Sequence, residues 1–381
     1  MSEPGSQSEL LWGARSRDLF WGERLQVARE FRGMTQKELS EAVSASPALV
    51  SLCESGKKNP SSRDLVEAFG SVLGFEPEFF YGNRQDVFRE EECSFRHRRS
   101  TPERMKNKIR AHATLIGFVV TRLKKEFRFP EPNIPKLQGD NAEEIESAAE
   151  KCRKHWNLGD GPIVEVAHVL EHAGVVIVSQ LADVQKVDAF SRFGSTCVIV
   201  LNQHIRSTSR WHFDIGHECG HLILHQGIDT GSEETEAAAD RFSSAFLMPR
   251  KAFARDFRSG SSSLWPQVFA LKRRWRTSAA AIIRRGYDLG LLDAVEYRKA
   301  HKYMSWKKWT TNGEPEEPAF QQPELLSTAL NSLGSKVQLT LEGLRRDLRF
   351  LPETFREVTG VNIPSQANRT NAIPFPVTGS N

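Results

Sequence analysis

Five consecutive residues near the middle of the 381-residue chain have the pattern HExxH: His217, Glu218, Cys219, Gly220 and His221. On a helix, side chains four residues apart project from one face, so both imidazoles can reach one tetrahedral Zn²⁺. The carboxylate between them then lies beside the open position of the metal, where it can take a proton from water and pass it to a leaving amine. The spacing predicts zinc-dependent hydrolysis, with His217 and His221 as ligands and Glu218 as general base.

A tetrahedral zinc site needs a third protein ligand, and two downstream residues compete for that role. His225 continues the same helix face, but three ligands along one straight helix span about 12 Å, too far for bonds of about 2 Å. Glu236 is the better candidate, because Asp240 lies one turn later and can hold a ligand imidazole by its far N–H. The longer pattern HExxHxxGxxH fails, since its last position is Gly227. We therefore expect a gluzincin-like site with Glu236 as third ligand and with Asp240 and the helix-end His225 as supporting groups.

The elements that position these residues are mostly helices. Helical patterns dominate residues 211–302, and the segment 233–248 carries both Glu236 and Asp240. Upstream, short apolar runs at 175–179 and 197–201 predict two buried strands. This half of the chain is therefore expected to form an α+β domain.

The motif is part of a longer pattern, HFDIGHECGHLILH followed by ETEAAADRFSSAFLMP. It resembles the ImmA/IrrE family of zinc metallopeptidases, and the likeness covers about residues 140–300, with a mild departure at Ala238, where the family often has an acid. The resemblance implies Zn²⁺ as cofactor, held by His217, His221 and Glu236, with Glu218 as base. It also implies a protein substrate, because members of this family cut a transcriptional repressor and so release stress, mobile-element or defence genes.

A second module precedes this region. Residues 22–82 contain TQKEL, a helix-turn-helix spacing and SLCESGKKNP, and Thr35 with Glu38 forms a capping box at a helix start. The stretch resembles the Cro/repressor-type (XRE-like) helix-turn-helix. We expect an all-α bundle whose second motif helix, about residues 47–54, faces a partner.

The exposed side chains of that helix leave two functions open. Arg, Asn and Gln, which make bidentate contacts to bases, are missing from this helix, although the flanking polar residues can bind phosphates. Its apolar surface can instead dock another protein. The candidate residues for DNA binding or partner docking are Gln36, Lys37, Pro47, Ala48, Leu49, Ser51, Leu52, Lys57 and Lys58.

The fold expected overall is mainly α with a small β component: the all-α helix-turn-helix bundle plus the α+β gluzincin-like metallopeptidase domain. Basic residues outnumber acidic ones from Arg89 to Arg128, which predicts a solvated basic helix or a contact for phosphate or an acidic partner. A further helix is expected at 337–355. The predicted segments are a polar tail (1–16), the helix-turn-helix domain (17–82), a basic helical connector (83–139), the peptidase domain (140–302) and a Pro/Gly/Ser-containing, partly disordered C-terminal extension (303–381).

Composition narrows the class of protein further. Hydrophobic residues make up 39% of the chain, enough to bury a core, and the net charge of +4 is too small to imply nucleic acid by itself. No apolar run approaches the roughly 18 residues of a membrane span, and the N-terminus lacks the apolar stretch of a secretory signal. The five scattered cysteines argue against a disulfide scaffold. We expect a cytoplasmic protein without a membrane partner.

Two functional hypotheses follow. The first is an intracellular zinc endopeptidase with a helix-turn-helix module, which cleaves a regulatory protein, a helix-turn-helix repressor by resemblance. The alternative is a DNA-binding transcriptional regulator in which the metallopeptidase-like domain acts as a sensor or dimerisation platform. The intact Glu218 favours the enzyme, because a purely structural zinc site needs no base.

Overall fold

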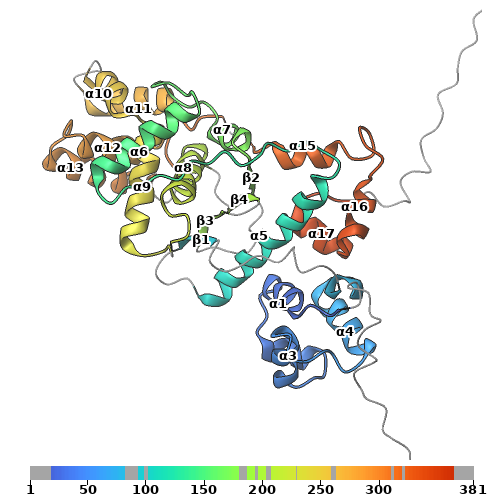
Figure 1. The fold of residues 1–381 in the computed structure, drawn as a ribbon. Helices are drawn as coiled ribbons and strands as arrows, with labels where there is room; N and C mark the ends of the chain where they lie inside the picture. The colour runs from blue at the N-terminus through green and yellow to red at the C-terminus, as the bar shows by residue number, and fades with distance from the viewer. Residues whose placement is uncertain are drawn as a thin grey trace, which may run out of the picture.

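The structure is a computed structural model, and it is mainly helical with one small sheet, as the sequence predicts (Figure 1). None of the described helices is long and apolar enough to cross a membrane. The residues that the structure describes are 19–81, 93–97, 102–179, 187–193, 196–202, 207–228, 230–258, 263–309, 313–319 and 322–363.

The N-terminal bundle consists of short helices whose starts are set by capping side chains. Thr35 and Glu38 form the predicted capping box, and the hydroxyls of Ser46 and Ser62 accept from backbone N–H groups at the next two helix starts. The predicted helix at 47–54 is confirmed, with Val50 and Cys53 buried as expected. The elements are α1 (Gly22–Phe31), α2 (Gln36–Ala42), α3 (Pro47–Glu54), α4 (Arg63–Leu73) and the 3₁₀ helix η2 (Pro77–Phe80).

The sheet has four strands in the order β1-β3-β4-β2. They are β1 (Cys93–His97), β2 (Val175–Val178), β3 (Val187–Arg192) and β4 (Cys197–Leu201). Strands β2 and β4 pair in parallel and are the two predicted strands, whereas β3 pairs antiparallel with both β4 and β1. The sequence patterns do not predict β3, because Ser191 and Arg192 are polar yet buried, and β1 lies within the region expected to be a basic helical connector.

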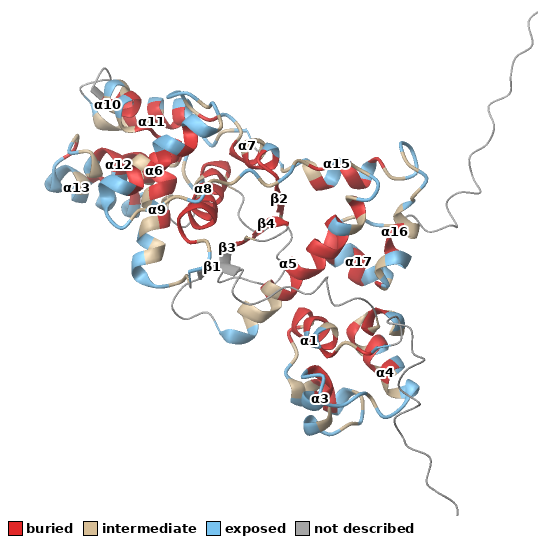
Figure 2. Cartoon of the chain, in the orientation of Figure 1, coloured by how far each residue is buried: buried red, intermediate tan, exposed pale blue. Residues whose placement is uncertain are grey.

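Helices on one side of the sheet enclose the core of the second domain (Figure 2). The central pair is α8 and α9, and α8 also contacts β3. The helices of this part are α6 (Ala142–His155), α7 (Val166–His172), α8 (Thr208–Leu224), α9 (Glu233–Leu247), α10 (Arg250–Arg258), α11 (Leu264–Trp275), α12 (Ala279–Asp288) and α13 (Ala294–Trp306).

The helix α5 (Glu103–Leu123) belongs to the core that it shares with the N-terminal bundle. Its residues 111–120 are all buried, and it packs against α1. The interpretation of the basic region as a solvated helix is therefore wrong for α5: the basic residues gather towards its ends, and the apolar middle is covered. Arg96 and His97 lie in β1, whereas Arg98 and Arg99 fall outside the described residues.

Three helices of the expected C-terminal extension pack on this same core. They are α15 (Leu325–Asn331), α16 (Leu341–Leu348) and α17 (Pro352–Thr359), so the single helix expected at 337–355 is two. Gly74, at φ +85°, ends α4 where a side chain would collide with Arg32 and Thr354. Its carbonyl accepts from the Thr354 hydroxyl at 2.6 Å, which joins the bundle to α17. The residues after 363 are outside the described part.

Candidate metal centre

The helices α8 and α9 approach closely because small residues line their contact. A Cβ at Gly216 would lie 2.6 Å from the Ser243 hydroxyl, and one at Gly220 would lie 3.2 Å from the Cα of Ala239. Neither Gly216 nor Ser243 is among the residues predicted from the sequence to matter for the site. The signal was present, since both helices repeat small residues at a spacing of four, which places them on one face.

This approach brings Glu236 of α9 to the two histidines of the motif on α8. The Nε2 atoms of His217 and His221 are 3.0 Å apart. The carboxylate oxygens of Glu236 lie 3.5 Å from the first Nε2 and 3.3 Å from the second. Ligands of a tetrahedral zinc ion with bonds of about 2.0–2.1 Å are about 3.3 Å apart, so the spacing matches such an ion. Among the described residues, these three form the group of side chains close enough to hold a metal.

The far nitrogen of each imidazole contacts a second side chain. Nδ1 of His217 lies 2.7 Å from a carboxylate oxygen of Asp240, and Nδ1 of His221 lies 2.9 Å from Nδ1 of His225. When both Nδ1–H groups donate to these partners, both Nε2 lone pairs face Glu236 and each other. Three electron-rich atoms at such distances repel one another unless a cation lies among them. The donor set therefore fits a metal ion.

The protonation states also suit metal binding. Burial raises the pKa of Glu236, but when His217 and His221 carry protons towards it, their hydrogen bonds and charge outweigh burial and lower that pKa to about 2. Burial lowers the pKa of His221 to about 4, with nearby histidines adding to the effect, and it also lowers the pKa of His225. A deprotonated carboxylate and neutral imidazoles are the forms that bind a metal.

The other predicted residues of this centre lie on the same two helices. Glu218 is fully buried on α8 between the two histidines. His225 is the residue at which α8 ends, and Asp240 lies one turn after Glu236 on α9. The side chain of Asp240 is 52% exposed, so the contact to His217 is open to solvent on one side.

The residues predicted for DNA binding or docking lie on the N-terminal bundle. Lys37, Pro47, Ala48, Ser51, Leu52, Lys57 and Lys58 are exposed. Leu49 is half-buried and packs against the bundle core. The amide of Gln36 donates to Glu54 at 2.8 Å, and Glu54 also binds Arg29 at 2.5 Å, so the Gln36 side chain is turned into the bundle.

Comparison with known families assigns both parts of the chain. Residues 170–286 match the IrrE N-terminal-like domain, and residues 22–78 match a helix-turn-helix domain. The first match contains β2 to β4, α8, α9 and every residue of the candidate metal centre. The chain thus carries a helix-turn-helix domain followed by a peptidase domain of the ImmA/IrrE type. No curated protein matches the chain.

Proposed function

We propose that the chain is a zinc-dependent endopeptidase that cleaves a regulatory protein. The observation that carries this proposal is that side-chain atoms of His217, His221 and Glu236 lie 3.0–3.5 Å from one another. In addition, the far nitrogen of each histidine ring contacts a further side chain. A surface cluster of the same residue types has no need for such paired support.

The chemistry follows from the donor set and from Glu218. Zinc bound by His217, His221 and Glu236 would polarise a peptide carbonyl and acidify a water molecule. Glu218 accepts the proton of the attacking water and returns it to the amine of the leaving peptide. Its burial removes competing bulk water from the carboxylate. Asp240 and His225 act as positioning residues, because they hold the two imidazoles in the ring orientation that the metal requires.

Metal content of the full chain tests the site. The wild-type protein is expected to bind one zinc per chain, and the double variant His217→Ala/His221→Ala to lose it. A matched control is His168→Ala/His172→Ala, a histidine pair at the same spacing on α7. Stoichiometric zinc in the His217→Ala/His221→Ala variant, measured by elemental analysis, would refute the ligand assignment.

The substrate class rests on the family resemblance. We propose a helix-turn-helix repressor as the protein that is cut, in a stress, mobile-element or defence response within the cytoplasm. The test is incubation of the zinc-loaded protein with helix-turn-helix proteins encoded near it, followed by gel and mass analysis for discrete fragments. Absence of fragments from every such protein would contradict this substrate.

A second candidate function is transcriptional regulation by DNA binding, with the peptidase domain as a sensor or dimerisation platform. The exposed face of α3 supports it, since helix-turn-helix folds place this helix in the major groove. This candidate predicts a footprint that shifts with base changes in a half-site.

A further inference from the structure

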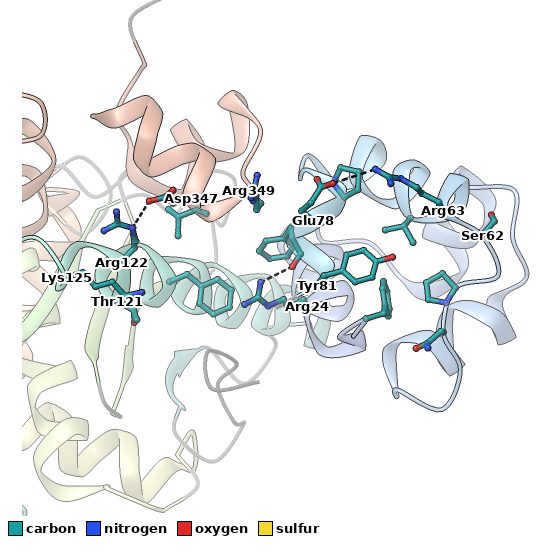
Figure 3. Close-up of a pocket in the computed structure, with 18 residues that line it drawn as sticks. Arg24, Ser62, Arg63, Glu78, Tyr81, Thr121, Arg122, Lys125, Asp347 and Arg349 are labelled. Atoms are coloured by element: carbon teal, nitrogen blue, oxygen red, sulfur yellow. Dashed lines mark hydrogen bonds and ion pairs between the residues drawn. The ribbon is translucent and has the colours of Figure 1, made fainter. Parts of the chain in front are cut away.

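A cavity and the outer face of one helix both gather basic side chains, but they differ in whether these side chains are paired. The cavity, of about 870 Å³, lies between the N-terminal bundle, α5 and the end of α16. Figure 3 shows two of its arginines in ion pairs, Arg122 with Asp347 at 2.7 Å and Arg63 with Glu78 at 3.8 Å. Charge that is already paired attracts a further ligand weakly, so the outer face of α13 is the stronger candidate for an anionic partner.

The outer face of α13 carries five exposed side chains at helical spacing. They occupy positions i, i+3, i+4, i+7 and i+11, which fall within an arc of about 100° on a helix of 3.6 residues per turn. The opposite side of the helix packs Ala300 and Met304 into the core of the second domain, so the outer face points to solvent (Figure 2). The five residues of this basic face are Val295, Arg298, Lys299, Lys302 and Trp306.

The three basic residues of this face have no acidic partner. Arg298, Lys299 and Lys302 form no ion pair with any residue that the structure describes. The acidic residue of α13, Glu296, turns back to the helix start, where its carboxylate accepts a hydrogen bond from the Asp293 backbone N–H at 2.9 Å. Three positive charges are therefore available to an anionic partner on a face about 16 Å long.

An indole ring lies at one end of the basic face. Trp306 is 71% exposed, the largest exposure among the big hydrophobic residues of the described chain. The Nζ of Lys307 lies 4.5 Å from the centroid of this ring, and the centroid of Tyr303 lies 5.8 Å away. Most of the indole is thus open to solvent beside positive charge. Because an indole buries a large apolar area when it is covered, a partner that covers Trp306 gains binding energy.

We propose that the basic face of α13 binds a single-stranded nucleic acid, with its phosphates along the three basic residues and one base stacked on Trp306. Arg and Lys neutralise the phosphates of the backbone, and unpaired bases stack on exposed aromatic rings. In a duplex the bases are already stacked on each other, so a duplex would leave the ring without a base. An anionic membrane takes up a continuous apolar helix face, whereas the apolar residues here, Val295 and Trp306, are eleven positions apart.

The basic face is separate from the other candidate sites of the chain. The helix α13 follows the matched peptidase domain, which ends at residue 286. It lies at the end of the second domain that is remote from the N-terminal bundle (Figure 1). Binding at α13 therefore requires neither the helix-turn-helix domain nor the metal, and the metal-free protein should bind as tightly as the zinc-loaded protein.

Fluorescence anisotropy of the full chain with a fluorescein-labelled oligodeoxythymidylate of about 12 nucleotides tests the proposal. Saturable binding is expected, with a slope of log affinity against log salt of about −2, because each of three neutralised phosphates contributes about −0.7. A duplex of the same length should compete at least about fivefold more weakly, since it offers no unstacked base. Absence of binding, or competition by the duplex or by polyglutamate as strong as by the unlabelled single strand, would overturn the assignment.

Two variants test whether the binding occurs on α13. Trp306→Ala should weaken binding about fivefold or more through the loss of one stacked base, and Arg298→Glu/Lys302→Glu should make the salt slope shallower by about 1.4. All three side chains are exposed, so the fold is expected to persist. The matched control is Lys151→Glu/Lys154→Glu, which makes the same change in net charge at two exposed residues of α6.

Equal affinity of Arg298→Glu/Lys302→Glu and this control for the probe would assign the binding to overall charge and overturn the site. Wild-type affinity of Trp306→Ala would overturn the stacking of a base and with it the preference for a single strand.

Discussion

The candidate metal centre and the exposed face of α3 differ in how firmly neighbouring contacts fix their side chains. In the metal centre, His217 and His221 are fully buried, and each ring contacts a further polar side chain. On α3, Ser51 and Leu52 are exposed, and Leu52 is absent from the side chains packed on the bundle core. Both regions carry sequence motifs strong enough to predict their local fold.

This comparison shows under which condition a sequence motif predicts function as well as local fold. A reaction needs its groups held in position before the substrate arrives, so the supporting contacts are themselves evidence of chemistry. A docking helix needs only a stable backbone, and its partner is chosen by the types of its exposed side chains. The metal centre therefore points to one activity, whereas the face of α3 leaves DNA and protein as alternatives.

The largest effect is expected from Glu218→Gln. The amide keeps the size of the side chain but accepts no proton, so cleavage should fall by a factor of about 10²–10⁴ or more. Zinc content and thermal stability should stay near those of the wild type, because Glu218 is not assigned as a ligand. A time course of fragment formation, with metal analysis of the same sample, provides the measurement. Undiminished cleavage by this variant would show that Glu218 is not the general base. The candidate metal centre would then predict function no better than the exposed face of α3 does.

A smaller loss is expected from Asp240→Ala. Without the carboxylate, the ring of His217 loses its hydrogen-bond partner, and zinc affinity should drop about 10–100-fold. Competition with a chelating dye measures this affinity. Arg241→Ala, the next residue on α9, is the control and should leave it unchanged. A zinc affinity of Asp240→Ala equal to that of the wild type would show that the contact does not position the ligand.

Acid should destabilise the core shared by the N-terminal bundle and α5, which contains no metal ligand. Burial lowers the pKa of His112 to about 4, although its ring nitrogen donates to the Val358 carbonyl at 3.4 Å. The unfolded chain, with a pKa of about 6.5, takes up the proton first, so this stability is complete above pH 6.5 and is lost as the pH falls towards 4. At pH 5 the loss in free energy of unfolding is about 2 kcal/mol.

Urea unfolding at pH 7.5 and at pH 5, in the wild type and in His112→Gln, measures this loss. Glutamine keeps a donor for the Val358 carbonyl but does not titrate, so the variant should lose about 2 kcal/mol less between the two pH values. The same pH dependence in both proteins would assign it to other groups.

The smallest effects concern α3 and distinguish its two possible partners. If the face docks a protein, Leu52→Glu should slow cleavage of the protein substrate about fivefold, for about 1 kcal/mol of lost apolar contact, and spare a short peptide. Leu52 is 39% exposed, so the fold should tolerate the charge, whereas Leu49→Glu should also lower stability. If the face binds DNA, Lys57→Ala/Lys58→Ala should reduce the slope of log affinity against log salt by about 2. A normal slope together with slower protein cleavage would favour docking.

The candidate site could be predicted largely from the sequence, because its parts follow helix spacing. His217 with His221, and Glu236 with Asp240, are each four residues apart, which places each pair on one face whatever surrounds the helix. The capping side chains Thr35 and Ser62 similarly mark helix starts through contacts within one turn. The assigned roles of the site residues remain predictions until the variants above are measured.

The sequence by itself determined the local elements and the chemical character of the metal centre, since both depend on residues within a few positions of each other. Only the tertiary structure decided that the middle of α5 is buried and that the polar residues Ser191 and Arg192 are buried in strand β3. It also decided that the C-terminal helices complete the core around the N-terminal bundle. The same holds for a cavity lined by Arg24, Lys125 and Arg349, which come from three separate parts of the chain. Such contacts join residues separated by up to hundreds of positions, and their register depends on packing and loop closure, which no local spacing specifies.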